Sequence, residues 1–140
     1  MTGIVILGVA VVVAVTFGVF RRATDGAFAA ESESTTWTQV SAALPSASLG
    51  ERATLVQFSS AFCAPCRTTR VVLADIAEQR DGVAHLEVDA EQHLELVRAL
   101  DVRRTPTTLV LDASGHEVAR AAGAPRRDQV LAVLPIGATP

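Results

Sequence analysis

The sequence predicts an α/β fold with a central mixed sheet, preceded by one helix long enough to cross a membrane. Two observations predict the sheet. From residue 53 onward, short apolar runs alternate with amphipathic stretches, and a hairpin-type turn at 112–115 separates the last two runs. A third observation predicts the spanning helix, because residues 3–20 carry no charged side chain. A chain of 140 residues has room for one domain beside such a helix.

The N-terminal run predicts a single-pass anchor in the cell membrane. As a helix, residues 3–20 would span about 27 Å, close to the roughly 30 Å of a bilayer core. Arg21 and Arg22 follow the run, and no basic side chain precedes it. The positive-inside rule therefore places the following domain in the cytoplasm. The alternatives are an outward-facing anchor and a cleaved secretory signal, for which residues 27–29 offer an Ala-x-Ala site.

The pattern divides the chain into three parts. Residues 1–22 are expected to form the anchor with its basic flank, 23–36 a juxtamembrane linker, and 37–136 the folded domain. In the domain, residues 37–40 begin either a short strand or a helix, which residues 41–44 extend by a turn. Trp37 is expected to plug the core beside the first strand, with anchoring at the membrane interface as the alternative.

The first confident strand covers residues 54–59, and its nearly continuous apolar character is typical of a strand covered on both faces. The amphipathic helix that follows residue 66 is expected to end at Asp81-Gly82. Its expected apolar face consists of Val72, Ile76 and Gln79, with Val71 and Leu73 beside them. Residues 83–88 form the second strand, which can lie parallel to the first.

The second half of the domain contains two further strands and two helices. Asp89 and Gln92 form an N-cap signature for a helix with Leu94, Val97 and Leu100 on one face. Residues 107–111 and 117–121 form an antiparallel pair of strands. The last helix is expected at 127–134, with Val130, Leu131 and Leu134 as its apolar residues.

Cys63 and Cys66 are the only cysteines, and they lie between the first strand and its helix. In this context the C-x-x-C spacing is typical of a dithiol redox centre. If Cys63 caps the helix, free backbone N–H groups and the helix dipole favour its thiolate, and Cys66 lies one turn further in. Pro65 suits a first helical turn because that turn needs no N–H from it. The alternatives are a structural disulfide, two unreactive thiols, or half a zinc site completed by histidines.

Several classes of function are not favoured. The net charge is −3, and no basic patch is interleaved with aromatic residues, so we expect no nucleic-acid partner. The three histidines, His85, His93 and His116, lack ligand spacing, so we expect no metal site.

Four separate segments resemble the thioredoxin family over residues 53 to 134. They are the strand–C-x-x-C–helix unit with Phe62 before the first cysteine, the strand 83–89, the loop 102–107, and the turn 112–115 together with Gly123. The resemblance implies a thioredoxin-like fold in which Pro106 is cis and faces the sulfurs. It also implies that the backbone of Thr105 pairs with substrate, as in strand addition.

The sequence departs from the family at several positions around the cysteines. Gln57 stands where the family usually has a buried Asp, and His85 where it has a Lys. Phe62 and Ala64 replace the usual Trp and Gly of the active site. A neutral Gln–His pair avoids the cost of burying charge. His85 either takes over proton transfer or is a hydrogen-bonded, partly buried residue.

Together, these features predict a membrane-held thiol–disulfide oxidoreductase that acts mainly as a disulfide reductase. Its implied partners are protein disulfides and an electron-donating reductase, and the resemblance implies no bound cofactor. Arg103 and Arg104 adjoin the expected substrate groove and could favour acidic targets. Three alternatives are a non-catalytic binding or assembly module on the same scaffold, extracytoplasmic disulfide exchange, and metal delivery by the dithiol.

Overall fold

A computed structural model of the chain describes residues 1–24 and 35–135. It divides into two units, residues 1–32 and 33–140. The first unit contains helix α1, Thr2–Thr24, whose apolar side chains from Ile4 to Val19 are exposed. The predicted apolar helix is therefore confirmed, and it is long and apolar enough for a membrane span or a signal sequence. Most of the expected linker, and the Ala-x-Ala site within it, lie outside the described residues.

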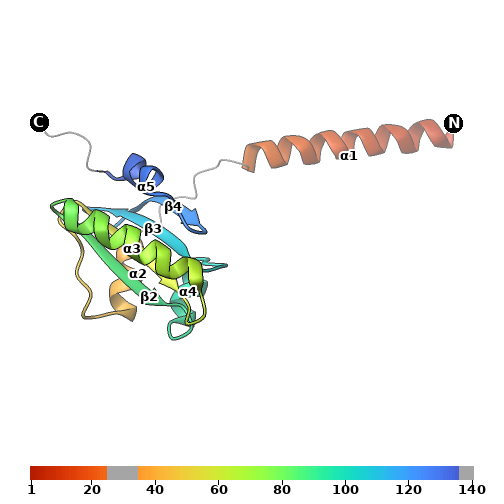
Figure 1. Cartoon of the computed structure of the whole chain (residues 1–140). Coiled ribbons are helices and arrows are strands. Elements are labelled where there is room, and N and C mark those ends of the chain that lie inside the picture. Colours follow the sequence, from red (N-terminus) through yellow and green to blue (C-terminus); the bar gives the residue numbers. More distant parts are fainter. Residues whose placement is uncertain (25–34, 136–140) are drawn as a thin grey trace, which may run out of the picture. The chain divides into compact units, whose positions relative to one another are not determined.

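The second unit is a four-stranded mixed sheet in the order β2-β1-β3-β4 (Figure 1). The strands are β1 (Ala53–Ser59), β2 (Val83–Asp89), β3 (Thr107–Asp112) and β4 (Glu117–Ala122). β1 pairs in parallel with β2 and antiparallel with β3, and β3 pairs antiparallel with β4. The predicted mixed α/β sheet is confirmed. All seven residues of β1 are buried, as its apolar sequence predicts for a central strand.

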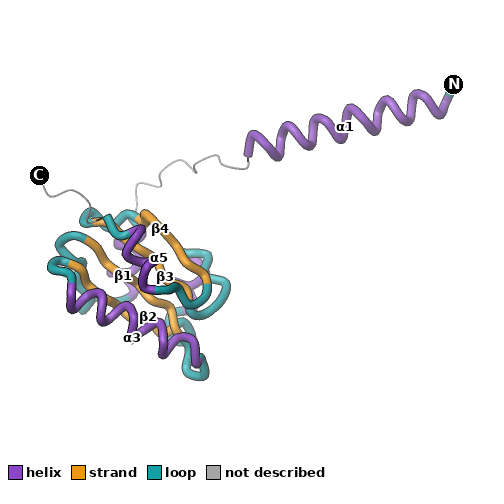
Figure 2. Tube along the Cα trace, turned by 45° about the horizontal axis from the view of Figure 1, so that its top comes forward, coloured by secondary structure: helices purple, strands orange, loops and turns teal. Residues whose placement is uncertain are grey.

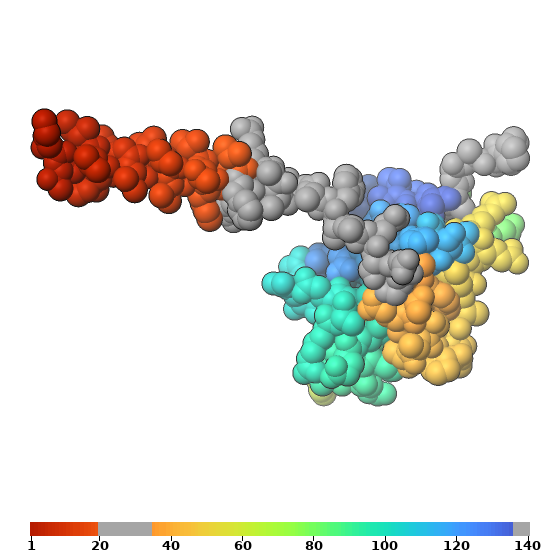
Figure 3. Space-filling model, turned by 180° about the vertical axis from the view of Figure 1, so that it is seen from behind, coloured from red at the N-terminus to blue at the C-terminus, as the bar shows by residue number. Residues whose placement is uncertain are grey.

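Helices cover both faces of the sheet. Helices α3 (Ala64–Gln79) and α5 (Arg127–Val133) pack on one face around Leu55 and Val110 (Figure 2). Helices α2 (Thr36–Ala43) and α4 (Leu94–Ala99) pack on the other face around Phe58 and Leu109. The view from behind shows α2 in orange beside α4 in teal (Figure 3). The sheet therefore separates two apolar layers, and the cysteine segment belongs to the layer under α3.

Helix α2 resolves the ambiguity at residues 37–40, because this segment is helical. The Thr35 side chain accepts a hydrogen bond from the backbone N–H of Thr38 and so caps the helix. Trp37 packs against the core layer, and its backbone N–H donates to the carbonyl of Gly115 at 3.0 Å. Trp37 is thus partly buried against the core, in agreement with the expected core role, and α2 is tied to the β3–β4 turn.

The apolar faces of two helices differ from the sequence prediction. Helix α4 begins at Leu94, because Asp89 binds the N–H of Glu91 in a turn and does not cap the helix. Of the expected face, Leu100 is buried and Val97 packs against the core, but Leu94 is exposed and Leu96 is buried instead. In α3 the buried positions follow a spacing of three or four residues, which leaves Val71 exposed. The buried residues of α3 are Cys66, Thr69, Leu73 and Ile76.

Candidate active site

Cys63 is the N-cap residue of α3 and follows the C-terminal end of β1. Its Sγ accepts a hydrogen bond from the backbone N–H of Cys66 at 3.2 Å. Pro65 lies in the first helical turn, where its missing N–H leaves no intrahelical bond unmade. The predicted capping position of Cys63 is confirmed, and its sulfur lies where the helix dipole favours negative charge.

The two cysteines form a disulfide with a Cα–Cα distance of 5.2 Å. Cys63 is 8% exposed and Cys66 1% exposed, so an incoming group reaches Cys63 first. Phe62 is fully exposed beside Cys63, and Ala64 is also on the surface. This difference in exposure matches an outer attacking sulfur and an inner resolving sulfur.

Gln57 lies fully buried in β1, behind the helix that carries the cysteines. Its side-chain amide donates to the carbonyl oxygen of Cys66 and to Oγ of Ser59, both at 2.9 Å. Its Oε1 lies 3.1 Å from Nε2 of His85, in the neighbouring strand. An amide oxygen only accepts, so His85 carries a proton on Nε2. The neutral Gln–His pair expected from the sequence is present as a hydrogen bond.

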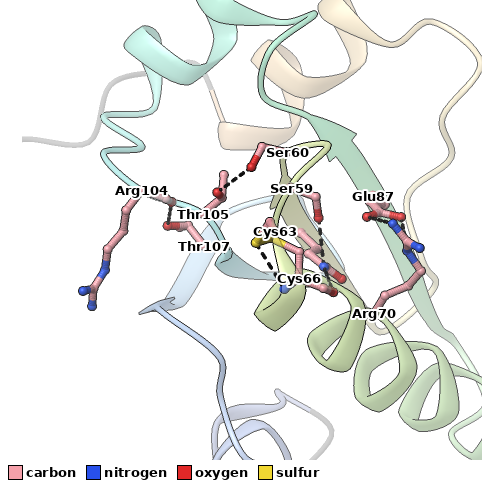
Figure 4. The surroundings of a disulfide bond; sticks show 10 residues. Ser59, Ser60, Cys63, Cys66, Arg70, Glu87, Arg104, Thr105 and Thr107 are labelled. Atoms are coloured by element: carbon pink, nitrogen blue, oxygen red, sulfur yellow. Dashed lines mark hydrogen bonds and ion pairs between the residues drawn. A yellow bond between two sulfur atoms is a disulfide. The ribbon is translucent and has the colours of Figure 1, made fainter.

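Two charged side chains, Glu87 of β2 and Arg70 of α3, affect the Gln57–His85 pair. Burial lowers the pKa of His85; nearby Glu87 opposes the effect and Arg70 adds to it. The Arg70 guanidinium binds both carboxylate oxygens of Glu87, at 2.5 and 2.6 Å (Figure 4). This contact lowers the pKa of Glu87, and a hydrogen bond from Ser59 lowers it further. The sequence analysis missed the Arg70–Glu87 pair, because the two residues belong to different elements and no local spacing links them.

The Thr105–Pro106 peptide bond is cis, as the family resemblance implied. Oγ1 of Thr105 lies 3.0 Å from Oγ of Ser60, which places this loop beside the cysteine segment (Figure 4). The N–H of Gly123 donates to the carbonyl of Pro106 at 2.7 Å. Gly123 has a φ of 99°, which disfavours other residues there. These contacts link the Thr105–Pro106 loop to Ser60 on one side and to Gly123 on the other.

A polar cavity of about 400 Å³ opens beside the disulfide. Both cysteines line it, together with Ser59, Ser60, Ala61, Arg67, Arg70, Glu87 and Asp89. Arg103 and Arg104 do not line this cavity. Arg103 pairs with Asp101, and Arg104 donates to the carbonyl of Ala122.

The histidines do not converge on the cysteines. His93 binds the carbonyl of Asp89, and His116 lies beside Asp112, while His85 binds Gln57. Within residues 1–24 and 35–135, no group of three or more His, Cys, Asp or Glu side chains is placed to hold a metal ion.

Comparison with known proteins agrees with this geometry. The family model described as thioredoxin matches residues 36–135. The chain belongs to the thioredoxin family. This family consists in general of thiol–disulfide oxidoreductases, and the Cys63–Cys66 pair fits its C-x-x-C motif.

Individual relatives extend the comparison. The chain is 40% identical over 58 residues to human "Thioredoxin domain-containing protein 2", covering 41% of this chain and 10% of that protein. It is 36% identical over 70 residues to rice "Thioredoxin H2-1" (Oryza sativa subsp. japonica), covering 50% of each chain. A mutant thioredoxin from Halobacterium salinarum superposes with a TM-score of 0.58 at 24% identity, covering 64% of this chain and 80% of that one, which supports the fold. The chain thus spans at most half the length of these two curated relatives.

Proposed function

We propose that the protein is a membrane-anchored thiol–disulfide oxidoreductase that acts mainly as a disulfide reductase. The observation that carries the proposal is the position of Cys63. Its sulfur caps α3 and accepts the N–H of Cys66, and Cys63 is the more exposed of the two cysteines. Such a sulfur is stabilised as a thiolate and is open to attack a target.

The reaction runs in two exchange steps. The Cys63 thiolate attacks one sulfur of the target disulfide and forms a mixed disulfide, while the other target sulfur leaves as a thiolate. The Cys66 thiol then loses its proton and attacks Sγ of Cys63, which releases the second target sulfur as a thiolate. The target gains two electrons, and the Cys63–Cys66 pair becomes the disulfide seen in this structure.

The loop at Thr105–Pro106 is the proposed substrate-binding segment. The hydroxyls of Thr105 and Ser60 hold it beside the cysteine turn. The backbone of Thr105 then pairs with the backbone of the target as an added strand, which holds the target disulfide in line with Cys63. Phe62, which is fully exposed next to Cys63, supplies apolar contact to the same target.

Helix α1 is the proposed membrane anchor. Its apolar side chains are exposed, and its length suits a bilayer core. The Arg21-Arg22 pair favours a cytoplasmic position for the domain, where a flavin-dependent reductase could return electrons to the cysteines. An outward-facing domain would instead need a membrane electron carrier.

An insulin-reduction assay with dithiothreitol tests the proposal. The full chain in detergent should accelerate the precipitation of insulin chains above the rate of dithiothreitol alone. A Cys63→Ser, Cys66→Ser double variant is the matched control and should show only the background rate. A wild-type rate equal to that of the double variant would favour a non-catalytic binding module on the same scaffold.

A further inference from the structure

Two buried hydroxyls lack a hydrogen-bond partner in the part of the chain that the structure describes. They are Oγ1 of Thr69 and Oγ1 of Thr108, and each side chain is 1% exposed. An unpartnered buried hydroxyl is destabilising, and native proteins leave few of them. These two atoms therefore call for a physical explanation.

Both hydroxyls belong to the layer that contains the inner cysteine. Thr108 on β3 is the cross-strand partner of Gln57, whose amide binds the carbonyl of Cys66. Thr69 lies three residues after Cys66 on the buried face of α3. Residues three apart on a helix are neighbours, with Cβ atoms about 5–6 Å apart. Side chains on a helix also lean toward its N-terminus, so Thr69 leans toward the turn of Cys66.

The sulfur of Cys66 changes its bonding needs during the redox cycle. In the disulfide, Sγ of Cys66 is bonded to Sγ of Cys63. When two electrons and two protons enter, the S–S bond breaks and Cys66 becomes a thiol. That thiol is a new donor and acceptor at a position that is 1% exposed. Because so little of Cys66 is exposed, a hydrogen-bonding partner within the protein stabilises this thiol.

We propose that the Thr69 hydroxyl is the hydrogen-bonding partner of Cys66 in the dithiol form and is left unpaired in the disulfide form. Thr69 is then a positioning residue that shifts the equilibrium of the cysteine pair toward the dithiol. The inference rests on the proposed function, since it requires that Cys63 and Cys66 cycle between the two forms. Thr69 is chosen over Thr108 because helix geometry places it next to Cys66.

The test measures the thiol–disulfide equilibrium of the full chain in detergent against dithiothreitol, by acid quenching, alkylation and mass spectrometry. Thr69→Val keeps the shape of the side chain but removes the hydroxyl. It should shift the equilibrium toward the disulfide by about three- to tenfold, which is the range for one net hydrogen bond. Thr69→Ser keeps the hydroxyl, so its thiol–disulfide equilibrium should lie within about twofold of wild type.

Unfolding in urea gives a second, independent readout. Thr69→Val should leave the oxidised protein as stable as wild type or more stable, because it removes an unpaired hydroxyl, and should lower the stability of the reduced protein. Thr54→Val is the matched control. Thr54 is a buried threonine whose Oγ1 accepts a hydrogen bond from the N–H of Gly50. Loss of this hydroxyl should lower the stability of both redox forms equally and leave the thiol–disulfide equilibrium unchanged.

The outcomes separate this inference from the proposed function. If the wild-type cysteines do not exchange with dithiothreitol at all, both the proposed oxidoreductase function and the role of Thr69 are wrong. If they exchange, but Thr69→Val stays within about twofold of wild type, only the role of Thr69 is overturned. An equal shift in Thr54→Val, or a shift in Thr69→Ser as large as in Thr69→Val, would overturn it as well.

Discussion

The side-chain amide of Gln57 hydrogen-bonds the carbonyl oxygen of Cys66 at 2.9 Å, so a neutral group supports the inner cysteine from below. The same amide binds Ser59, and His85 donates to its oxygen. Every polar atom of this side chain is thus in use at a fully buried position. A titratable side chain at residue 57 would break this arrangement.

Gln57→Asp should lower the free energy of unfolding by about 1–3 kcal/mol at neutral pH, because a carboxylate cannot donate to Cys66 or Ser59. Burial should raise the pKa of the new carboxyl, so the loss grows as the pH rises above about 4, the unfolded value. Urea unfolding at two pH values measures this. Gln57→Met is the control, with a loss that does not depend on the pH; a parallel result for both variants would contradict the prediction.

The same variant probes the thiol chemistry. Gln57→Asp places a titratable group near Cys66, so the rate of the resolving step should acquire a new dependence on pH. Stopped-flow release of a target peptide from the mixed disulfide measures this step. An unchanged pH–rate profile in folded Gln57→Asp would show that residue 57 has no link to the reaction.

His85 should make stability fall in mildly acidic solution. Burial lowers its pKa in the folded state, so below about pH 6.5 the unfolded chain binds the proton first. The free energy of unfolding should therefore drop as the pH falls from about 6.5 toward the folded pKa. Glu87 acts in a separate window, because its lowered pKa makes its contribution disappear only below about pH 4.5. Urea unfolding between about pH 7 and 5 should show the drop in wild type and a flatter curve in His85→Gln.

The two cysteines should differ in their single variants. Cys63→Ser removes the nucleophile and should abolish insulin reduction. Cys66→Ser leaves Cys63 able to attack but unable to release, so mixed disulfides with targets should accumulate. Non-reducing electrophoresis detects them. Similar behaviour of both variants, without a trapped species in either, would rule out the ordered mechanism.

Gly115→Ala should weaken the contact between the β3–β4 turn and α2. Gly115 has a φ of 84°, and an added Cβ would lie 2.4 Å from Cβ of Trp37. We expect a loss of about 1–3 kcal/mol from backbone strain and the displaced indole. Trp37 is the only tryptophan, so its fluorescence reports both the shift and the unfolding. Ser114→Ala, at an exposed position of the same turn, should unfold like wild type.

A labelling experiment decides the side of the membrane. Intact cells are treated with an impermeant reductant and then with an impermeant thiol reagent. With the domain in the cytoplasm, Cys63 should be labelled only after permeabilisation. Labelling of Cys63 in intact cells would contradict the cytoplasmic assignment. A mature N-terminus at Ala30 would show that the N-terminal segment is a cleaved signal and not an anchor.

The sequence predicted the order and type of the elements because local patterns determine them. The apolar run of β1, the capping cysteine and the turn at 112–115 each involve neighbours in the chain. The start of α4 was predicted wrongly. Asp89 and Gln92 do interact, but they close a turn, and the helix begins at Leu94.

The sequence pattern could not predict contacts between side chains of different helices and strands. The bond between Gln57 and His85 could be anticipated only through the family positions that they replace. No such guide existed for Arg70 with Glu87, or for the unpaired hydroxyl of Thr69. These contacts depend on the order of the strands and on which face each helix turns to the sheet. Both are known only once the three-dimensional structure is known.

The central position of β1 has a consequence for how the domain opens. Its backbone amides bond to β2 on one side and β3 on the other, so β1 can exchange its hydrogens only when the sheet itself separates. The edge strand β4 and the short helix α5 should open at a much lower free-energy cost, because β4 pairs with one strand only and α5 is short. Cys63 lies four residues after the end of β1, so local opening of β4 should leave the cysteine turn folded while it releases the bond from Gly123 to Pro106 and loosens the proposed substrate-binding loop.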